Sequence, residues 1–525
     1  MSGWGGGYVT DSAYVPAYFK MQSPATLMLA CRLNGVVCDL AADSEEVAYL
    51  ELGCGLGYTA LAIAAANPSW RVTAVDFNPA HVAFARGFAL RAGLANIRIL
   101  EADLASLAED TAAAAIPEAD MVSLHGVWSW VGPEVRSGIL RLLKAKLRPG
   151  GMVGISYNAL PAWQEALALQ RVLAEAGRRL AVRSDRQARA GFEFVRALRT
   201  AGARAVPAGG MVGRLIEAKD GYADEYLAHE FMNRHWQPFF HLDVAQAMAE
   251  AKLDYVGGLR PLDNFLELQL TEAQRKLAEQ FEDPLMRELV KDTCAGAGLR
   301  QDLYVRGPLR TGPAGRDAAL AGTWLALTGA PESFRFSLMT PAGEANLSPD
   351  FYTPILARLA AGPATVGELV ALARVEGRPD NPAELVGVLV GSDQALTVLR
   401  PGAPAGAAAE RFNREAAAQF GGLQAAPLAM GLASAALGGA MPSSRFDLLL
   451  WRALSRQPGG ADIGAIATAI GGAQMSAEQR SAIEEAVAQT LALRAGAWAA
   501  AGLLAEPIAK HPVSGRDGVV VVSAG

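Results

Sequence analysis

The feature that most constrains the fold is a regular alternation of apolar strands with helices between residues 47 and 160. Strands are predicted at 47–52, 71–78, 97–100, 120–126 and 152–158. Helices are predicted at 58–68, 81–93 and 135–151. Apolar strands joined by helices of this length form a parallel sheet that is covered on both faces, with right-handed crossovers. The alternation therefore predicts an α/β fold with a Rossmann-like sheet.

The next part of the chain adds helices first and strands later. Residues 164–235 are amphipathic and predict a helical insertion. Residues 243–259 predict a helix followed by a strand, and 302–307 predict a last strand. We expect both strands to rejoin the sheet, which then has seven strands.

After residue 310 the predicted structure is mainly α-helical. Residues 354–373 predict a helix, a turn and a helix, and 382–402 predict a third helix and a short strand, an order similar to a winged helix. The longest predicted helix of the C-terminal region covers 475–505. The expected segments are a cap at 1–45, a core at 46–163, a helical insertion at 164–235, a segment completing the sheet at 236–310, a winged-helix-like domain at 311–405 and a mainly helical domain at 406–525.

Composition excludes several classes of protein. The net charge is −6, whereas phosphate binding needs clustered Lys and Arg, so we expect no nucleic-acid partner. Four cysteines without a Cys-x-x-Cys pair indicate a reducing compartment. The N-terminus lacks a signal-peptide pattern, and the longest uncharged run, 416–444, is rich in Ala and Gly and broken by Pro427. That run is interpreted as a linker or a packed helix, which predicts a cytoplasmic protein without a membrane span.

The sequence YLELGCGLGYTALAIA (49–64) carries the main chemical signal. Gly53, Gly55 and Gly57 make a tight turn from the first strand into a helix. A dinucleotide would place its pyrophosphate at that helix N-terminus, yet Glu51 precedes the turn and no Lys or Arg is near. A carboxylate there favours a ligand with an ammonium and a sulfonium, which describes S-adenosylmethionine. The Gly-x-Gly-x-Gly spacing also differs from the dinucleotide fingerprint.

Two further acids follow the next strands. Asp76 ends the second strand, about 20 residues after the last loop glycine, where an acid can accept hydrogen bonds from ribose hydroxyls. Asp103 follows the third strand and is predicted to accept from an adenine amino group. Each acid alone is more often a solvated strand-end residue, but together they fit one ligand across the carboxyl edge of the sheet.

The motifs ELGCGLG, AVDFNP, EADL and LRPGG together resemble the class I S-adenosylmethionine-dependent methyltransferases. HGVWSWV (125–131), SYNALPAW (156–163) and LRQDLYVRG (299–307) resemble the bacterial members with a methyltransferase regulatory domain, which include the rickettsial protein-lysine methyltransferases. The resemblance implies a seven-stranded class I methyltransferase fold, a cap with Tyr14 in the wall of the site, and a possible homodimer formed through 164–235. It implies cofactor contacts from Glu51, Gly53, Cys54, Gly55, Gly57, Asp76, Phe77, Asp103, Leu104 and His125.

Methyl transfer needs an aligned nucleophile in a partly dry pocket more than a covalent catalyst. The candidate catalytic residues are His125, Tyr157 and Asn158. The candidate substrate-binding residues are Tyr14, Trp128, Trp130 and Trp163. We expect Tyr157 or Asn158 to orient an incoming amine, His125 to accept its proton, and the tryptophan faces to attract a cation. The alternatives are a structural role for His125 and core packing for the tryptophans.

Three histidines, His229, His235 and His241, recur at six-residue intervals, which does not place them on one helix face, so no metal site is predicted. The leading functional prediction is N-methylation of protein lysine side chains by direct displacement. A small-molecule methyltransferase and a cofactor-binding regulatory protein without turnover are the alternatives.

Overall fold

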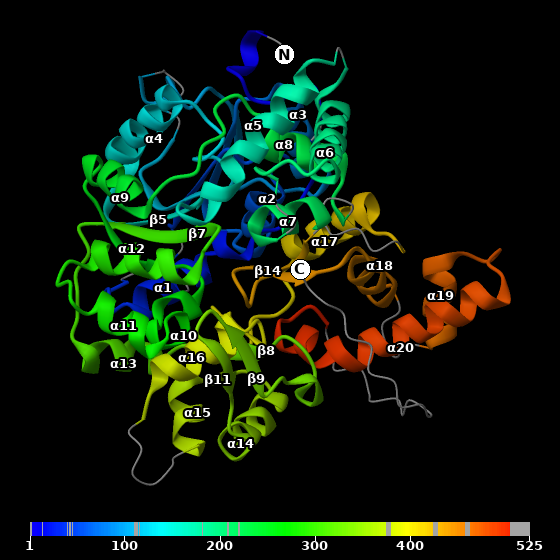
Figure 1. Ribbon diagram of the computed structural model, residues 1–525. Helices are drawn as coiled ribbons and strands as arrows, with labels where there is room; N and C mark the ends of the chain where they lie inside the picture. The colour runs from blue at the N-terminus through cyan, green and yellow to red at the C-terminus, as the bar shows by residue number, and fades with distance from the viewer. Residues whose placement is uncertain are drawn as a thin grey trace.

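The computed structural model has an N-terminal α/β part and a C-terminal part that lies beside it (Figure 1). The described residues are 3–12, 14–38, 40, 44, 46–109, 114, 116–180, 182–206, 209–218, 221–373, 380–423, 429–456 and 462–504. Residues 505–525, the end of the predicted C-terminal segment, lie outside the described residues.

Seven strands form the central sheet, in the order β3-β2-β1-β4-β5-β7-β6. They are β1 (Ala48–Leu52), β2 (Arg71–Asp76), β3 (Ile97–Glu101), β4 (Ala119–Leu124), β5 (Leu147–Asn158), β6 (Leu253–Gly258) and β7 (Leu299–Arg306). The first five strands run parallel, and β7 runs antiparallel to both of its neighbours, β5 and β6. The two late strands rejoin the sheet as predicted, so the seven-stranded Rossmann-like fold is confirmed.

Helices cover both faces of this sheet and create two apolar cores. On one face lie α1 (Pro24–Leu33), α2 (Tyr58–Ala66) and α3 (Pro79–Arg91). On the other face lie α4 (Pro133–Lys146) and α9 (His241–Glu250). Side chains of Ser23 and Asn78 cap α1 and α3 at their N-termini, and each helix has proline in its first turn. Burial on both faces explains why the strands are continuously apolar.

The predicted helical insertion forms a small bundle with its own core. It contains α5 (Leu167–Arg178), α6 (Ser184–Thr200), α7 (Gly210–Ala218) and α8 (Asp224–Phe231), preceded by a short 3-10 helix, Ala162–Ala166. In Figure 1, α5, α6 and α8 lie close together. The indole N–H of Trp130, a residue that follows β4, donates to the Glu230 carbonyl at 3.2 Å and ties α8 to the carboxyl end of β4.

The segment between β6 and the winged-helix-like part is helical apart from β7. It contains α10 (Leu266–Gln269), α11 (Glu272–Ala278) and α12 (Pro284–Ala295). The next part contains α13 (Pro313–Ala321), β8 (Trp324–Leu327), β9 (Ser337–Thr340), β10 (Gly343–Asn346), α14 (Pro349–Ala360), β11 (Ala364–Thr365), α15 (Val366–Leu372), α16 (Pro382–Gly391) and β12 (Ala395–Val398). An antiparallel sheet in the order β11-β8-β12 packs with these helices, so the predicted helix, turn, helix, helix and strand are present.

The last part contains α17 (Ala407–Phe420), β13 (Met430–Ser434), β14 (Gly439–Ser443), α18 (Arg445–Leu454), α19 (Ile463–Gly471) and α20 (Ala477–Ala500). The interpretation of 416–444 as a linker or packed helix is wrong for its second half, where β13 and β14 form a hairpin. Pro427 lies outside the described residues. The small residues serve close packing: a Cβ on Gly431 would lie 2.9 Å from the Tyr18 ring. The Tyr58 hydroxyl also donates to the Gly431 carbonyl at 2.8 Å, so the hairpin packs on α2.

A search of the described helices for a membrane-crossing segment finds none of sufficient length and apolar character.

Candidate active site

The glycine turn after β1 has the geometry that its sequence predicted. Backbone N–H groups of Gly53 and Cys54 donate to the Val75 carbonyl at 2.8 and 3.0 Å, which folds the turn against β2. Gly53, Gly55 and Gly57 have φ values of +72°, +54° and +75°, in the left-handed region that favours glycine. A Cβ on Gly53 would also lie 2.5 Å from a methyl of Val127. Only glycine therefore fits at position 53.

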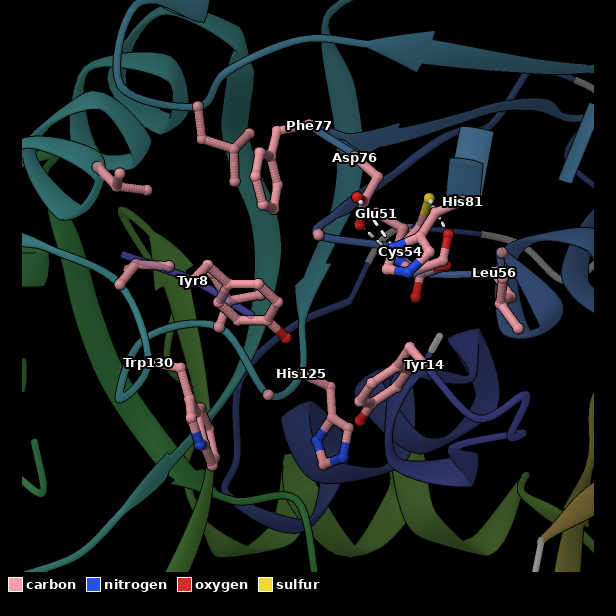
Figure 2. A pocket seen from close by; sticks show the side chains of 18 of the residues that line it. Tyr8, Tyr14, Glu51, Cys54, Leu56, Asp76, Phe77, His81, His125 and Trp130 are labelled. Carbon is pink, nitrogen blue, oxygen red and sulfur yellow. Dashed lines mark hydrogen bonds and ion pairs between the residues drawn. The ribbon is translucent and has the colours of Figure 1, made fainter. Parts of the chain in front are cut away.

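A cavity lies over this turn at the carboxyl ends of the first strands (Figure 2). All ten residues predicted to contact the cofactor line it: Glu51, Gly53, Cys54, Gly55, Gly57, Asp76, Phe77, Asp103, Leu104 and His125. Figure 2 shows the acids Glu51 and Asp76 together, and Tyr8, Tyr14 and Trp130 on the other side. Among the described residues that line the cavity there is no lysine or arginine, so nothing there favours a pyrophosphate.

Glu51 is a buried carboxylate with an unused oxygen. Its Oε1 accepts a hydrogen bond from the Gln22 amide at 3.0 Å, whereas Oε2 has no partner in the described part of the chain. Burial raises the pKa of Glu51 to about 7. An unpaired, buried carboxylate oxygen beside a glycine turn fits a ligand that brings an ammonium group. Gln22, held by a second hydrogen bond to the Ser123 hydroxyl at 2.9 Å, was not identified from the sequence, where a single Gln carries no signal.

Asp76 orders the turn and faces the cavity. Its Oδ2 accepts from the Gly55 N–H at 2.8 Å, and its Oδ1 accepts from the Asn78 N–H at 2.9 Å. A carboxylate has about four acceptor positions, so capacity remains for ribose hydroxyls. Asp103 is exposed, and its Oδ1 accepts from the Ala105 N–H at 2.9 Å. Both acids lie where one nucleoside can reach them.

The N-terminal cap supplies more aromatic rings than the sequence indicated. Tyr14, the predicted wall residue, lines the cavity. Trp4 and Tyr8 also line it, and their rings lie 5.8 and 5.7 Å from the Phe77 ring, centroid to centroid. The available signal was the placement of aromatic residues in the glycine-rich stretch at the start of the chain.

A second cavity of about 900 Å³ adjoins the first, between the strand ends and the helical insertion. The two cavities share the wall residues Tyr8, Tyr14, Val15, Ala17, Phe19, His125, Gly126 and Trp130. Asn158 and Trp163 line the second cavity, and the Trp163 indole donates to the Gly298 carbonyl at 2.7 Å. The structure thus brings three predicted substrate-binding residues, Tyr14, Trp130 and Trp163, and the candidate catalytic residue Asn158 to one adjoining space.

Glu230, on α8, is the residue of this cavity that sequence reasoning missed. Its Oε1 accepts a hydrogen bond from the Asn158 amide at 3.3 Å, and burial raises its pKa to about 7. One signal was available: Glu230 stands in the last turn of a helix, where the negative end of the helix dipole disfavours a carboxylate. Glu230 therefore does not stabilise its own helix, which indicates another role for this side chain.

His125 lies where the two cavities meet, but its chemistry differs from the prediction. Its Nδ1 is 2.7 Å from the Ser156 hydroxyl, and its ring packs 4.0 Å from Phe19. Burial lowers the pKa of His125 to about 4, so the ring is neutral at neutral pH and a weak base. A ring with so low a pKa does not suit the predicted role of proton acceptor.

Two predicted residues lie away from both cavities. The prediction for Tyr157 is not supported. Side chains alternate along β5, so Asn158, which lines the second cavity, and Ser156, which contacts His125, point to one side, whereas Tyr157 points to the opposite side. Its hydroxyl donates to Asp302 at 2.6 Å. Trp128 is buried in the core beneath α4 and packs edge-on against Phe239, so it has the alternative role of core packing.

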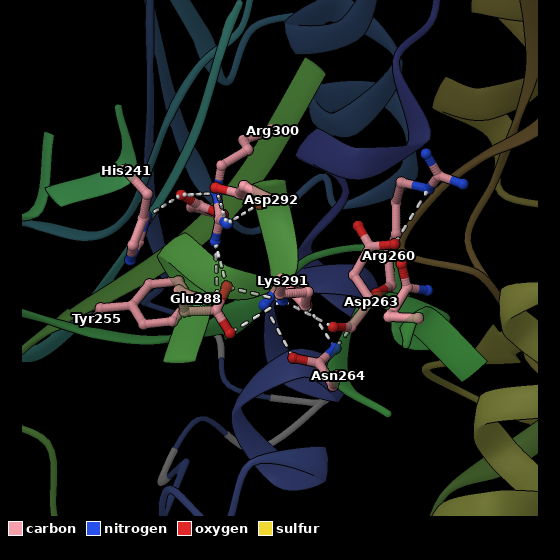
Figure 3. A network of polar contacts seen from close by, with 12 residues as sticks. His241, Tyr255, Arg260, Asp263, Asn264, Glu288, Lys291, Asp292 and Arg300 are labelled. Atoms are coloured by element: carbon pink, nitrogen blue, oxygen red, sulfur yellow. Dashed lines mark hydrogen bonds and ion pairs between the residues drawn. The ribbon is translucent and has the colours of Figure 1, made fainter. Parts of the chain in front are cut away.

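The Tyr157 hydroxyl is bonded to Asp302, which belongs to a buried ionic network centred on Arg300. Figure 3 shows Arg300 together with Asp292 and Glu288. The guanidinium donates hydrogen bonds to the carboxylates of Asp292 at 2.7 Å, Asp302 at 3.1 Å and Glu288 at 2.7 Å. Burial alone would raise the pKa of Asp302, but Arg300 and then His241 outweigh it and hold that pKa well below its usual range. The network joins α9, α12 and β7 to β5, and so supports the strand end that carries Asn158.

Two of the three evenly spaced histidines have hydrogen-bond partners. His229 contacts the Ser12 carbonyl through Nε2 at 3.0 Å, and His241 contacts Asp302 through Nδ1 at 3.1 Å. His235 lines the first cavity beside Gly132. Within the described residues, no group of three or more potential metal ligands comes together.

Comparison with known proteins agrees with this geometry. Residues 50–153 match a family model described as a methyltransferase domain, and residues 223–306 match one described as a predicted methyltransferase regulatory domain. The chain is 30% identical over 374 residues to the uncharacterized protein sll1526 of Synechocystis sp., covering 71% of this chain and 73% of that protein. It is 25% identical over 238 residues to an uncharacterized protein of Rickettsia prowazekii, covering 45% of this chain and 91% of that protein.

Two solved structures share the fold over most of the chain. PKMT2 from Rickettsia typhi has a TM-score of 0.67 at 16% identity, covering 91% of this chain and 98% of that one. The same protein in complex with AdoHcy has a TM-score of 0.70 at 17% identity, covering 94% and 100%. Strand order, glycine turn, cavity acids and both family matches agree. The chain belongs to the class I S-adenosylmethionine-dependent methyltransferases that carry a methyltransferase regulatory domain.

Proposed function

We propose that this methyltransferase modifies an amine of a protein side chain, the lysine ε-amine. The observation that carries the proposal is the second cavity, whose aromatic walls surround a single inner carboxylate, Glu230. Aromatic faces attract a cation, and a carboxylate pairs with it, so the cavity is suited to an ammonium group. Because its walls are shared with the cofactor cavity, an amine held there approaches the methyl group.

The access to this cavity favours a macromolecular acceptor. Its outer wall includes the exposed residues Glu165, Gly210, Tyr222 and Ala223 of the helical insertion. A long, flexible side chain such as lysine reaches inward from solvent while its backbone stays outside. The resemblance to the rickettsial protein-lysine methyltransferases supports the same acceptor class. A dimer formed through the insertion remains part of this proposal.

The chemistry asks the protein to position groups and to remove a proton. S-adenosylmethionine, when bound, supplies a methyl carbon made electrophilic by its sulfonium. Glu51, Asp76 and the glycine turn would hold it through its ammonium, ribose and backbone contacts. Trp130 and Tyr14 exclude water from the junction of the cavities, and holding reactants in attack geometry contributes roughly 7–11 kcal/mol to lowering the barrier.

The test is transfer of label from methyl-labelled S-adenosylmethionine to a bacterial lysate separated into protein and small-molecule fractions. We expect label in protein, recovered as N-methyllysine after acid hydrolysis. Label confined to the small-molecule fraction would instead establish a metabolite methyltransferase. Cofactor binding with no label in either fraction would indicate a regulatory protein. The G53A variant, disrupted at the turn, serves as the negative control.

A further inference from the structure

We propose that the Glu230 carboxylate accepts the proton that the acceptor amine loses during methyl transfer, an inference that rests on the function proposed above. A lysine ammonium has no lone pair and cannot attack carbon. With an ordinary pKa near 10.4, only roughly one lysine in a thousand is neutral at pH 7.4. A group beside the bound amine that takes its proton therefore raises the fraction of amine able to react.

Among the described side chains that line the second cavity, Glu230 is the strongest candidate acceptor. His125 is a neutral, weak base. His229 is held through Nε2, 3.0 Å from the Ser12 carbonyl, and packs edge-on against the Tyr14 ring. Glu165 lies at the exposed rim, where its Oε2 accepts from the Met211 N–H at 3.3 Å. Glu230 lies further in, beside Asn158 and Trp130. Its Oε1 is held by Asn158, and among the described residues no second donor bonds the carboxylate.

The groups around Glu230 keep its charge uncompensated. Tyr8 and Tyr14 face it from the N-terminal cap, and Tyr226 faces it from its own helix. Burial and the Glu230 charge raise the pKa of Tyr14 to about 12, so its phenol stays protonated. Among the described residues that line the cavity, Arg214 of α7 is the single lysine or arginine, and it is exposed. An incoming ammonium is thus the natural partner of this carboxylate.

The reaction balances with this assignment. The proton passes from the amine nitrogen to Glu230. The freed lone pair forms the new N–C bond as the bond between that carbon and sulfur breaks, with its electron pair remaining on sulfur. Glu230, whose pKa is raised to about 7, then releases the proton to solvent through the open side of the cavity. A base with a pKa near the working pH is the most effective for such transfer.

The experiment compares E230Q with E193Q, which removes an exposed carboxylate of α6 that does not line the cavity. Initial rates of label incorporation into lysate protein are measured from pH 6 to 9, with cofactor binding measured by calorimetry. We expect E230Q to lower the rate roughly 100-fold at pH 7.5, within the usual range for general base catalysis. E193Q should retain the wild-type rate within a factor of about two, because an exposed carboxylate outside the cavity takes no part.

The pH profile separates a proton acceptor from a structural residue. Above pH 7.5 wild type should be almost flat, because Glu230 is ionised, whereas E230Q should gain roughly tenfold per pH unit as free amine appears. If E230Q fails to fold, E230D replaces it: a flat profile supports the inference and a tenfold slope contradicts it. An E230Q variant with wild-type rate and profile would overturn the inference and leave the proposed function standing. No protein labelling by wild type would overturn the proposed function itself.

Discussion

Replacing Glu51 with Gln removes the negative charge that the cofactor cavity presents to an ammonium group. The substitution preserves shape and leaves an oxygen to accept from Gln22, so its effect is mainly electrostatic. A hydrogen bond to a charged group contributes about 1.5–3 kcal/mol. We therefore expect E51Q to bind S-adenosylmethionine roughly 10- to 150-fold more weakly than wild type at pH 7.5.

The pH dependence of binding follows from the same carboxylate. In the ligand-free protein the pKa of Glu51 is raised to about 7, and the cation binds the ionised form. The ionised fraction falls roughly eightfold between pH 7.5 and pH 6, so wild-type affinity should fall by that factor. S-adenosylmethionine also titrates, and its titration affects both proteins equally. The affinity of E51Q therefore measures the ligand's contribution alone and should not show the additional eightfold loss.

Stability should move in the opposite direction. A carboxylate whose folded-state pKa is raised contributes stability that is fully present below its ordinary pKa, near 4.5, and is lost as the pH rises through about 7. Above pH 7 the buried charge therefore destabilises the ligand-free protein, by roughly 3 kcal/mol for a shift of this size. E51Q should raise the unfolding midpoint at pH 8 and have little effect at pH 4.5.

Calorimetric titrations at pH 6, 6.75 and 7.5, together with thermal unfolding, provide the assay. For E51Q we expect weaker cofactor binding, no pH effect on affinity beyond the ligand's own titration, and higher stability without ligand. Unchanged affinity in E51Q, or an equal eightfold pH effect in both proteins, would refute the assignment of Glu51 to the ammonium group.

Two further substitutions test the turn and the buried network. G53A adds a methyl that would overlap Val127 at a left-handed φ, whereas G150A has similar φ strain and open space, so G53A should weaken cofactor binding at least ~10-fold more than G150A; equal affinities would contradict the close-approach argument. R300M removes the guanidinium that pairs with three buried carboxylates. Glu288 keeps Lys291, and Asp302 keeps Tyr157 and His241, but Asp292 loses its ion pair with Arg300. The substitution should lower the free energy of unfolding in urea by about 3–5 kcal/mol. The partly exposed control R275M should change it by less than ~1 kcal/mol, and an equally small effect of R300M would show that the network contributes little.

Two sequence predictions failed because the sequence does not show which distant residues a segment packs against. Alternation along β5 was visible in principle, but nothing in SYNALPAW shows which of Tyr157 and Asn158 faces the cofactor, because a shift of one residue exchanges the two faces. The Ala- and Gly-rich run that became β13 and β14 has few large side chains, so its periodicity is weak. Its role depends on Tyr18 and Tyr58, which lie far away in the chain.

The chain itself determined the sheet and the cofactor turn, because both depend on neighbouring residues: apolar strand periodicity, helix length, and glycines placed where φ must be positive. These local requirements are visible as residue spacing in the sequence. Glu51, which precedes the glycine turn, likewise predicted a ligand with a positive charge. The acceptor cavity was decided only by tertiary structure. Asn158 and Glu230 meet across 72 residues, and Gln22 reaches Glu51 from outside the sheet. No local sequence pattern predicts such contacts, because distant segments contact and bury one another only after the chain has folded.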